Sequence, residues 1–180
     1  MNTIATEQLT YLRGYPQEAL DKVAQMLRDN RVGTWLTNRY PQAHGIRTDR
    51  ALYEYVQALK TEHLRGADAV NKVAFDSKLQ IVQHALGTHA TVSRVQGSKL
   101  KAKREIRIAS LFKDCPPEFL KMIVVHELAH LRERNHDKAF YNLCTYMEPG
   151  YHQLEFEVRL YLTHLDTVGT RCWAAVDCTA

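Results

Sequence analysis

The feature that most constrains the fold is a long apolar segment interrupted by two histidines and a glutamate. It begins at Pro116–Pro117, extends to about Arg134, and places apolar side chains on several faces of a helix. Such a helix belongs in the centre of a protein, because a surface helix carries a single apolar stripe. The run His-Glu-Leu-Ala-His occupies residues 126–130 inside it. Unpaired polar groups are costly to bury, so these side chains are expected to have a common partner.

A metal ion is the partner that this spacing indicates. His126 and His130 differ by about 40° around a helix, so both imidazoles can reach one ion. Zinc with three protein ligands keeps a fourth position for water, whose pKa it lowers to about 7. Glu127 can take a proton from that water as general base. Zinc suits the imidazole ligands best, with Mn²⁺, Fe²⁺ or Ni²⁺ as alternatives.

The third ligand is predicted to be His136, which follows the second histidine at the metzincin spacing. Glu133 stands where that pattern has glycine. The chain must therefore turn without glycine, and Asn135 is expected to take the left-handed conformation there. Glu155 or Glu157, from a later helix, is the alternative third ligand.

The remaining hydrophobic pattern predicts an α+β fold. Thr48 can cap a helix in the first third of the chain. Alternating residues between positions 70 and 109 predict a small antiparallel sheet. Arg104 interrupts the apolar side of its last strand, which predicts a bulge or a break there. Further helices are expected over residues 140–147 and 152–164.

The length of 180 residues suits one domain. We expect a single metal-dependent hydrolase domain over residues 1–180. It would comprise an N-terminal helical layer (1–66), a catalytic core (67–165) and a tail (166–180).

Composition and charge limit the classes of binding partner that the sequence supports. The net charge of +4 is too mild to indicate a nucleic-acid binder by itself. No apolar run approaches the ~20 residues of a membrane span, and no signal peptide is visible, so a cytoplasmic protein without a membrane partner is expected. The four cysteines form no Cys-x-x-Cys pair and are expected to be free thiols. Pairing or metal binding by Cys172 and Cys178 is the weaker alternative.

A basic stripe is the local candidate for phosphate or nucleic-acid contacts. It consists of Arg94, Lys99, Lys101, Lys103 and Arg107. Near the metal these residues would suit a triphosphate. The alternative is an ordinary solvated face of the sheet.

Three more residues are candidates for supporting roles. Tyr151 and Tyr141 can hydrogen-bond a developing oxyanion, and Asp137 can orient the ring of His136. Half-buried tyrosines and a helix-capping aspartate are the alternative interpretations.

The metal motif and its surroundings resemble the YgjP-like metallopeptidase family, and more distantly the SprT-like and WLM zincins. The resemblance rests on residues 122–130, 135–140 and 147–151, with further similarity at 86–87, 92–94 and 106–108. It covers roughly residues 70 to 165.

That resemblance implies a zincin-like α+β fold with the metal between the central helix and the small sheet. It also implies His126, His130 and His136 as ligands and Glu127 as base. One close bacterial branch of the family is labelled UTP pyrophosphatase.

Three functional hypotheses follow. The first is a zinc-dependent hydrolase of the metallopeptidase type, acting on peptides. The second is a nucleoside triphosphate pyrophosphohydrolase that converts UTP to UMP and pyrophosphate at the same site, with Mg²⁺ or Mn²⁺ in addition. The third is a non-catalytic nucleic-acid-binding module with a structural zinc, in which Glu127 has no task.

Overall fold

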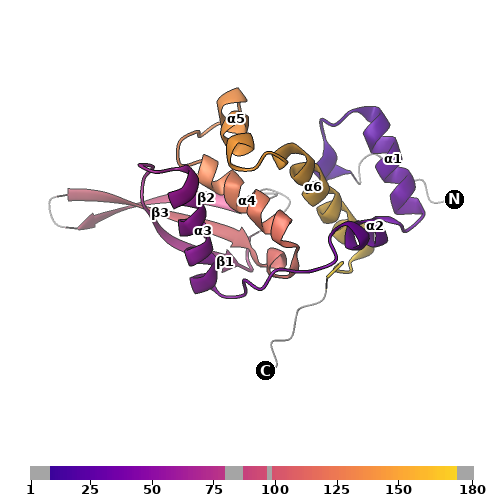
Figure 1. Cartoon of the computed structure of the whole chain (residues 1–180), viewed down its shortest axis with the longest axis horizontal. Helices are drawn as coiled ribbons and strands as arrows, with labels where there is room; N and C mark the ends of the chain where they lie inside the picture. The colour runs from indigo at the N-terminus through magenta and orange to yellow at the C-terminus, as the bar shows by residue number, and fades with distance from the viewer. Residues whose placement is uncertain (1–8, 80–86, 97–98, 174–180) are drawn as a thin grey trace, which may run out of the picture.

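The computed structural model describes residues 9–79, 87–96 and 99–173, with side chains for residues 9–79 and 104–173. Its elements form a mixed arrangement of helices around a small sheet (Figure 1), as the α+β prediction requires. In chain order they are η2 (Thr10–Leu12), α1 (Gln17–Arg28), α2 (Val32–Arg39), α3 (Asp49–His63), β1 (Val70–Asp76), β2 (Gly87–Gln96), β3 (Lys99–Ala109), η3 (Ser110–Asp114), α4 (Pro117–Ala129), α5 (Lys138–Met147) and α6 (Tyr151–Val168).

The sheet has the strand order β1-β3-β2 and is mixed rather than wholly antiparallel. Strands β2 and β3 pair antiparallel, as predicted, whereas β1 pairs parallel with β3. The alternation of apolar residues is the same in both kinds of strand, because side chains alternate between faces whatever the strand direction. The direction of β1 was therefore not readable from its sequence.

The irregularity predicted at Arg104 lies in the neighbouring strand. Strand β3 is continuous, and the register with β1 shifts between Val70 and Lys72, so that Asn71 is the extra residue. The Asn71 side-chain oxygen accepts a hydrogen bond from the Arg104 backbone N–H at 3.0 Å. The bulge thus satisfies a backbone donor that would otherwise lack its partner.

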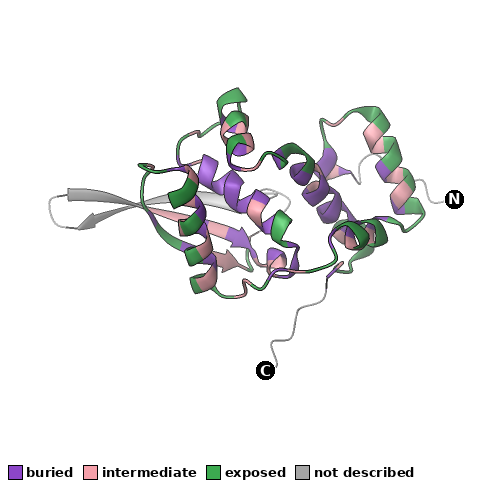
Figure 2. Cartoon of the chain, viewed as in Figure 1, coloured by how far each residue is buried: buried purple, intermediate pink, exposed green. Residues whose placement is uncertain are grey.

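Two helices pack on the sheet and against each other. Helix α3 contacts β1, α4 contacts β2 and β3, and α3 also contacts α4. The hydroxyl oxygen of Thr48 caps α3 as predicted, accepting from the Ala51 backbone N–H at 3.1 Å. In α4, ten of the 13 residues are buried, which makes it the central helix (Figure 2).

Helices α1 and α2 lie away from the sheet, on the side of α6 (Figure 1). No separate helix was predicted over the residues of α2. In the structure Gly33 lies inside α2, where an added Cβ would come within 3.2 Å of Cε1 of His164 on α6. Glycine here allows α2 and α6 to pack closely.

Buried polar contacts also join α2 to α6. The fully buried Glu157 accepts hydrogen bonds from the Tyr40 hydroxyl and from Gln153, the latter at 2.7 Å, and pairs with Arg39 at 3.0 Å.

Among the described residues, none of the helices is long and apolar enough to cross a membrane.

Candidate metal centre

The central helix ends earlier than the sequence pattern indicated. Helix α4 stops at Ala129, with His130 as its C-cap, rather than at about Arg134. The chain then tightens through hydrogen bonds from Leu131 N to Leu128 O and from Arg132 N to Ala129 O, both 3.0 Å. Such short-range bonds close the last turn of a helix without glycine.

The predicted left-handed turn at Asn135 is wrong. Among the described non-glycine residues a positive φ occurs at Asn30, and Asn135 is not in that region. The turn is instead held from outside the loop, because the Arg104 guanidinium donates to the Leu131 carbonyl oxygen at 3.3 Å. The apolar face of β3 is interrupted by Arg104 because this side chain anchors the loop after α4.

Three histidine rings converge at this helix end. The Nε2 atom of His136 lies 3.2 Å from Nε2 of His126 and 3.1 Å from Nε2 of His130. Nitrogens bound to one tetrahedral zinc, at about 2.0–2.1 Å each, are about 3.3 Å apart. His126 is buried and His136 is exposed, so solvent reaches one side of the cluster.

The outward nitrogens of two rings have fixed partners. The His126 Nδ1 lies 2.7 Å from the Tyr151 hydroxyl, and the His130 Nδ1 lies 3.0 Å from the Glu133 carbonyl oxygen. A carbonyl oxygen only accepts, so the His130 Nδ1 carries the hydrogen and its Nε2 lone pair faces the centre. Such partners orient metal ligands in many proteins.

For His126 and His130 the structure favours the neutral ring, which is the form that binds metals. Burial, followed by the nearby His130 and His136, lowers the pKa of His126 well below its ordinary value. Burial likewise lowers the pKa of His130. Protonation would leave a positive charge in a site that water cannot fully solvate.

Phe140 forms one wall of the cluster, a role that the sequence analysis did not assign to it. Its ring centroid lies 5.0 Å from that of His126 and 4.7 Å from those of His130 and His136. Asp137 brings it there as the N-cap of α5, accepting from the Ala139 and Phe140 backbone N–H groups at 3.0 and 3.1 Å. The structure therefore places Asp137 as a helix cap.

Glu127 is buried with one unpartnered oxygen. The residue is 1% exposed, and its Oε2 atom has no hydrogen-bond partner among the described residues. Burial raises the pKa of this carboxyl group to about 8. A buried polar atom without a partner is costly, and a water molecule beside a bound ion would supply one. The three facing nitrogens and this carboxylate thus fit a divalent metal ion.

The alternative third ligands are engaged elsewhere. Glu155 pairs with Arg159 at 2.7 Å, and Glu157 is held by the contacts with Tyr40 and Arg39. Within the described residues, the group of ligand atoms that can hold an ion consists of the three histidines. An ion held by these three ligands would keep a coordination position for water, which is typical of catalytic zinc rather than structural zinc.

Most of the basic stripe lies outside the described side chains, namely Arg94, Lys99, Lys101 and Lys103. The described member, Arg107, pairs with Asp76 at 3.1 Å and with Glu105 at 3.2 Å. Its charge is therefore neutralised within the sheet.

The structure also describes Tyr141 and three of the four cysteines. Tyr141 is half-buried, with its ring centroid 6.3 Å from that of Tyr151. Cys115, Cys144 and Cys172 are free thiols, as expected, and Cys178 lies outside the described residues.

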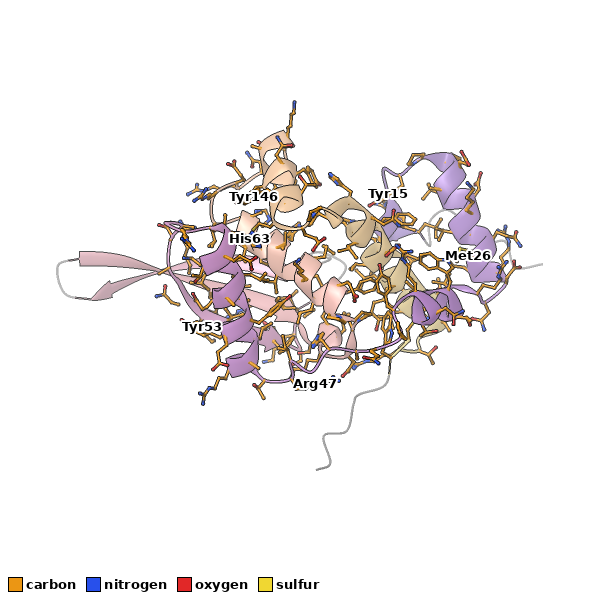
Figure 3. The ribbon with its side chains drawn as sticks, viewed as in Figure 1. Tyr15, Met26, Arg47, Tyr53, His63 and Tyr146 are labelled. Carbon is orange, nitrogen blue, oxygen red and sulfur yellow. The ribbon has the colours of Figure 1, made fainter. Side chains whose placement is uncertain are left out.

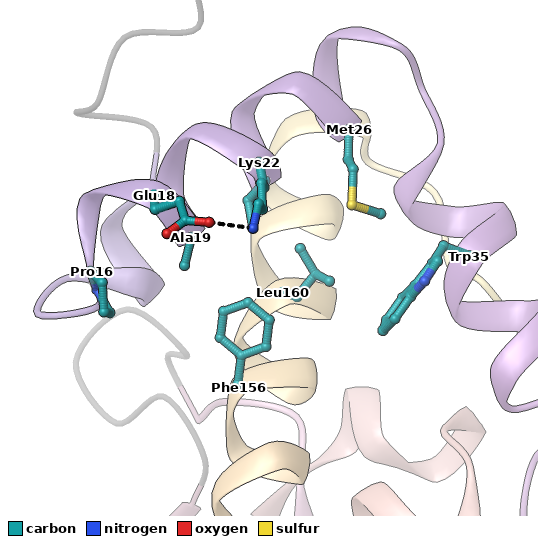
Figure 4. A pocket seen from close by; sticks show the side chains of 9 residues that line it. Pro16, Glu18, Ala19, Lys22, Met26, Trp35, Phe156 and Leu160 are labelled. Atoms are coloured by element: carbon teal, nitrogen blue, oxygen red, sulfur yellow. Dashed lines mark hydrogen bonds and ion pairs between the residues drawn. The ribbon is translucent and has the colours of Figure 1, made fainter.

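A separate cavity of about 460 Å³ lies between α1, α2 and α6 (Figure 4). Its lining is mainly apolar and includes Val23, Met26, Trp35, Phe156 and Leu160. None of the three clustered histidines lines it. The cavity is therefore distinct from the metal centre.

A central helix carrying His-Glu-x-x-His beside a small sheet, with a third histidine in the following loop, defines a metal-dependent hydrolase of the zincin type. The chain belongs to the YgjP-like family, whose metallopeptidase domain it matches over residues 47–159. A protein of Escherichia coli strain K12 named UTP pyrophosphatase is 55% identical over 157 residues. The matched region covers 87% of this chain and 94% of that protein. No solved structure shows a significant match.

Proposed function

We propose that the protein is a nucleoside triphosphate pyrophosphohydrolase that converts UTP to UMP and pyrophosphate at the histidine cluster. The observation that carries this proposal is the 55% identity to the Escherichia coli UTP pyrophosphatase over 94% of that protein's length. Identity of this extent makes a shared substrate the simplest expectation. We further propose zinc as the ion, because imidazole ligation and the tetrahedral spacing of the nitrogens suit it.

His126, His130 and His136 would hold the ion through their Nε2 atoms. When bound, a divalent ion supplies Lewis-acid activation of water and neutralises phosphate charge. Glu127, next to the first ligand on α4, accepts the proton of the attacking water. Water attacks phosphorus, the bond between the α- and β-phosphates breaks, and pyrophosphate leaves. Burial of Glu127 keeps bulk water from competing for this carboxylate.

The direct test is pyrophosphate release from UTP, CTP, ATP and GTP by zinc-loaded protein, with Mg²⁺ or Mn²⁺ added in parallel. Glu127→Gln should release none. Glu118→Gln is the matched control, because Glu118 is exposed at the opposite end of the same helix. Pyrophosphate release by the wild type and by Glu118→Gln, but not by Glu127→Gln, supports the proposal. An active Glu127→Gln variant would refute the role given to Glu127.

Peptide hydrolysis is the second candidate, favoured by the family's description as a metallopeptidase domain. The same residues suit attack of water on a peptide carbonyl, with Glu127 returning its proton to the leaving amine. Digestion of a peptide library by zinc-loaded protein tests it. Cleavage without pyrophosphate release would favour this candidate over the first.

A further inference from the structure

The segment around the third clustered histidine carries cations that the mechanism above does not use. Residues 130–137 connect α4 to α5, and Arg134 and Lys138 lie two residues before and two residues after His136. The contact between the His130 ring and the Glu133 carbonyl oxygen folds this loop against the cluster. Arg134 therefore lies between two of the proposed ligands.

Nearby basic side chains are already neutralised or occupied. Arg104 pairs with Asp68, and Arg159 pairs with Glu155. Arg132 donates to the Arg65 carbonyl oxygen at 3.3 Å and so ties the loop to the end of α3. There, His63 packs edge-to-face on Tyr146 of α5, with ring centroids 5.9 Å apart (Figure 3). These contacts hold the loop in place.

Arg134 and Lys138 differ from these anchoring residues. Both are exposed, and neither forms an ion pair with any side chain in the described part of the chain. The two carboxylates of this segment, Glu133 and Asp137, form no ion pair with either cation among the described contacts, and the Asp137 side chain caps α5. Two exposed cations without an ion-pair partner among the described residues therefore flank the exposed His136 in the sequence.

We propose that Arg134 and Lys138 bind the phosphate chain of the nucleotide, an assignment that rests on the proposed function. Arginine presents planar N–H donors that match phosphate oxygens, and lysine contributes a point charge. The described member of the basic stripe, Arg107, is unsuited to this task because Asp76 and Glu105 already neutralise it. This assignment places phosphate recognition on the segment around the third histidine.

Binding measurements test this assignment independently of turnover. Dissociation constants of α,β-methylene-UTP, which cannot be cleaved between its first two phosphates, and of UMP are measured by calorimetry on zinc-loaded protein. Arg134→Gln and Lys138→Gln should each weaken binding of the triphosphate analogue by about tenfold, the loss expected for a charged hydrogen bond. UMP binding should weaken by less than about threefold, because it has one phosphate.

Arg31→Gln is the matched control, since Arg31 is also exposed and makes no ion pair with a described residue, but lies at the start of α2. The zinc content of each variant shows whether the loop still holds the metal. Unchanged affinity in both variants, with analogue binding by the wild type, would overturn this assignment and leave the proposed function standing. A wild type that neither binds the analogue nor hydrolyses UTP would overturn both.

Discussion

The hydroxyl of Tyr151, at the start of α6, lies 2.7 Å from the Nδ1 atom of His126, the innermost of the clustered histidines. Tyr151 is fully buried, and burial raises the pKa of its phenol, so the hydroxyl stays neutral. With the His126 Nε2 facing the cluster, the Nδ1–H group donates to the tyrosine oxygen. A buried tyrosine here takes the place of the carboxylate or carbonyl that usually orients a metal-bound histidine.

Tyr151→Phe is therefore expected to weaken zinc binding by about 10- to 100-fold while retaining the fold. The phenyl ring fills nearly the same space, so the loss reports the hydroxyl rather than a cavity. Competition with a chromophoric chelator measures the zinc affinity. Tyr141→Phe is the control, because Tyr141 makes ring contacts near the site but no hydrogen bond to a clustered histidine among the described contacts. Equal zinc affinity in both variants would show that the hydroxyl does not support His126.

Removing the metal should lower the thermal stability of the wild type, because an ion that binds only the folded state stabilises it. At free zinc one hundred times the dissociation constant, the stabilisation is about 2.7 kcal/mol. For a chain of this size that corresponds to a melting temperature change of roughly 5–10 °C. Melting curves with and without EDTA measure it.

His136→Ala separates stabilisation by the bound metal ion from stabilisation by side-chain packing. The residue is exposed and lies in a loop, so the metal-free variant should melt near the metal-free wild type. Added zinc should raise its melting temperature much less than that of the wild type. A full zinc-dependent shift in this variant would contradict the assignment of His136 as a ligand.

Glu127→Gln should keep the metal and increase the stability of the metal-free protein. In the wild type, burial raises the pKa of this carboxyl group to about 8, so folding disfavours its charged form. Glu127 therefore lowers the free energy of unfolding. This destabilisation is absent at pH below about 4.5 and develops as pH rises toward 8, because the carboxyl group ionises at lower pH in the unfolded state than in the folded state. The stability gain of the glutamine variant should therefore be larger at pH 8 than at pH 5. Urea unfolding in EDTA at both values measures it, and a pH-independent difference would oppose this account.

His44 provides a second pH-dependent contribution. It is buried, its Nε2 atom lies 2.7 Å from the Phe112 carbonyl oxygen, and its Nδ1 accepts from the Ile46 backbone N–H at 3.0 Å. Burial lowers its pKa below the ordinary 6.5, so the neutral ring is favoured in the folded state. Its stabilising contribution is complete above pH 6.5 and is lost as pH falls through the lowered folded value.

We therefore expect His44→Gln to destabilise the protein at pH 7.5 by about 1–3 kcal/mol, and by less at pH 5.5. Urea unfolding of both proteins in EDTA measures the difference. The chelator keeps the contributions of the clustered histidines equal in the two proteins. A cost that stayed constant or grew on acidification would show that the native state tolerates a charged His44.

The sequence by itself determined the features set by local spacing. His126 and His130 share one side of α4 because a helix repeats every 3.6 residues, and Thr48 caps α3 through a contact only three residues away. The apolar character of α4 indicated its central position. These relationships need no knowledge of the rest of the chain.

Tertiary structure decided the contacts between distant elements. The pairing of Tyr151 with His126, the packing of Phe140 on the clustered histidines and the anchoring role of Arg104 depend on how α5, α6 and β3 pack around α4. The parallel direction of β1 was equally unreadable, because alternation does not encode strand direction. Packing selects among many arrangements that share the same local pattern, so only the folded chain showed which side chains contact the clustered histidines.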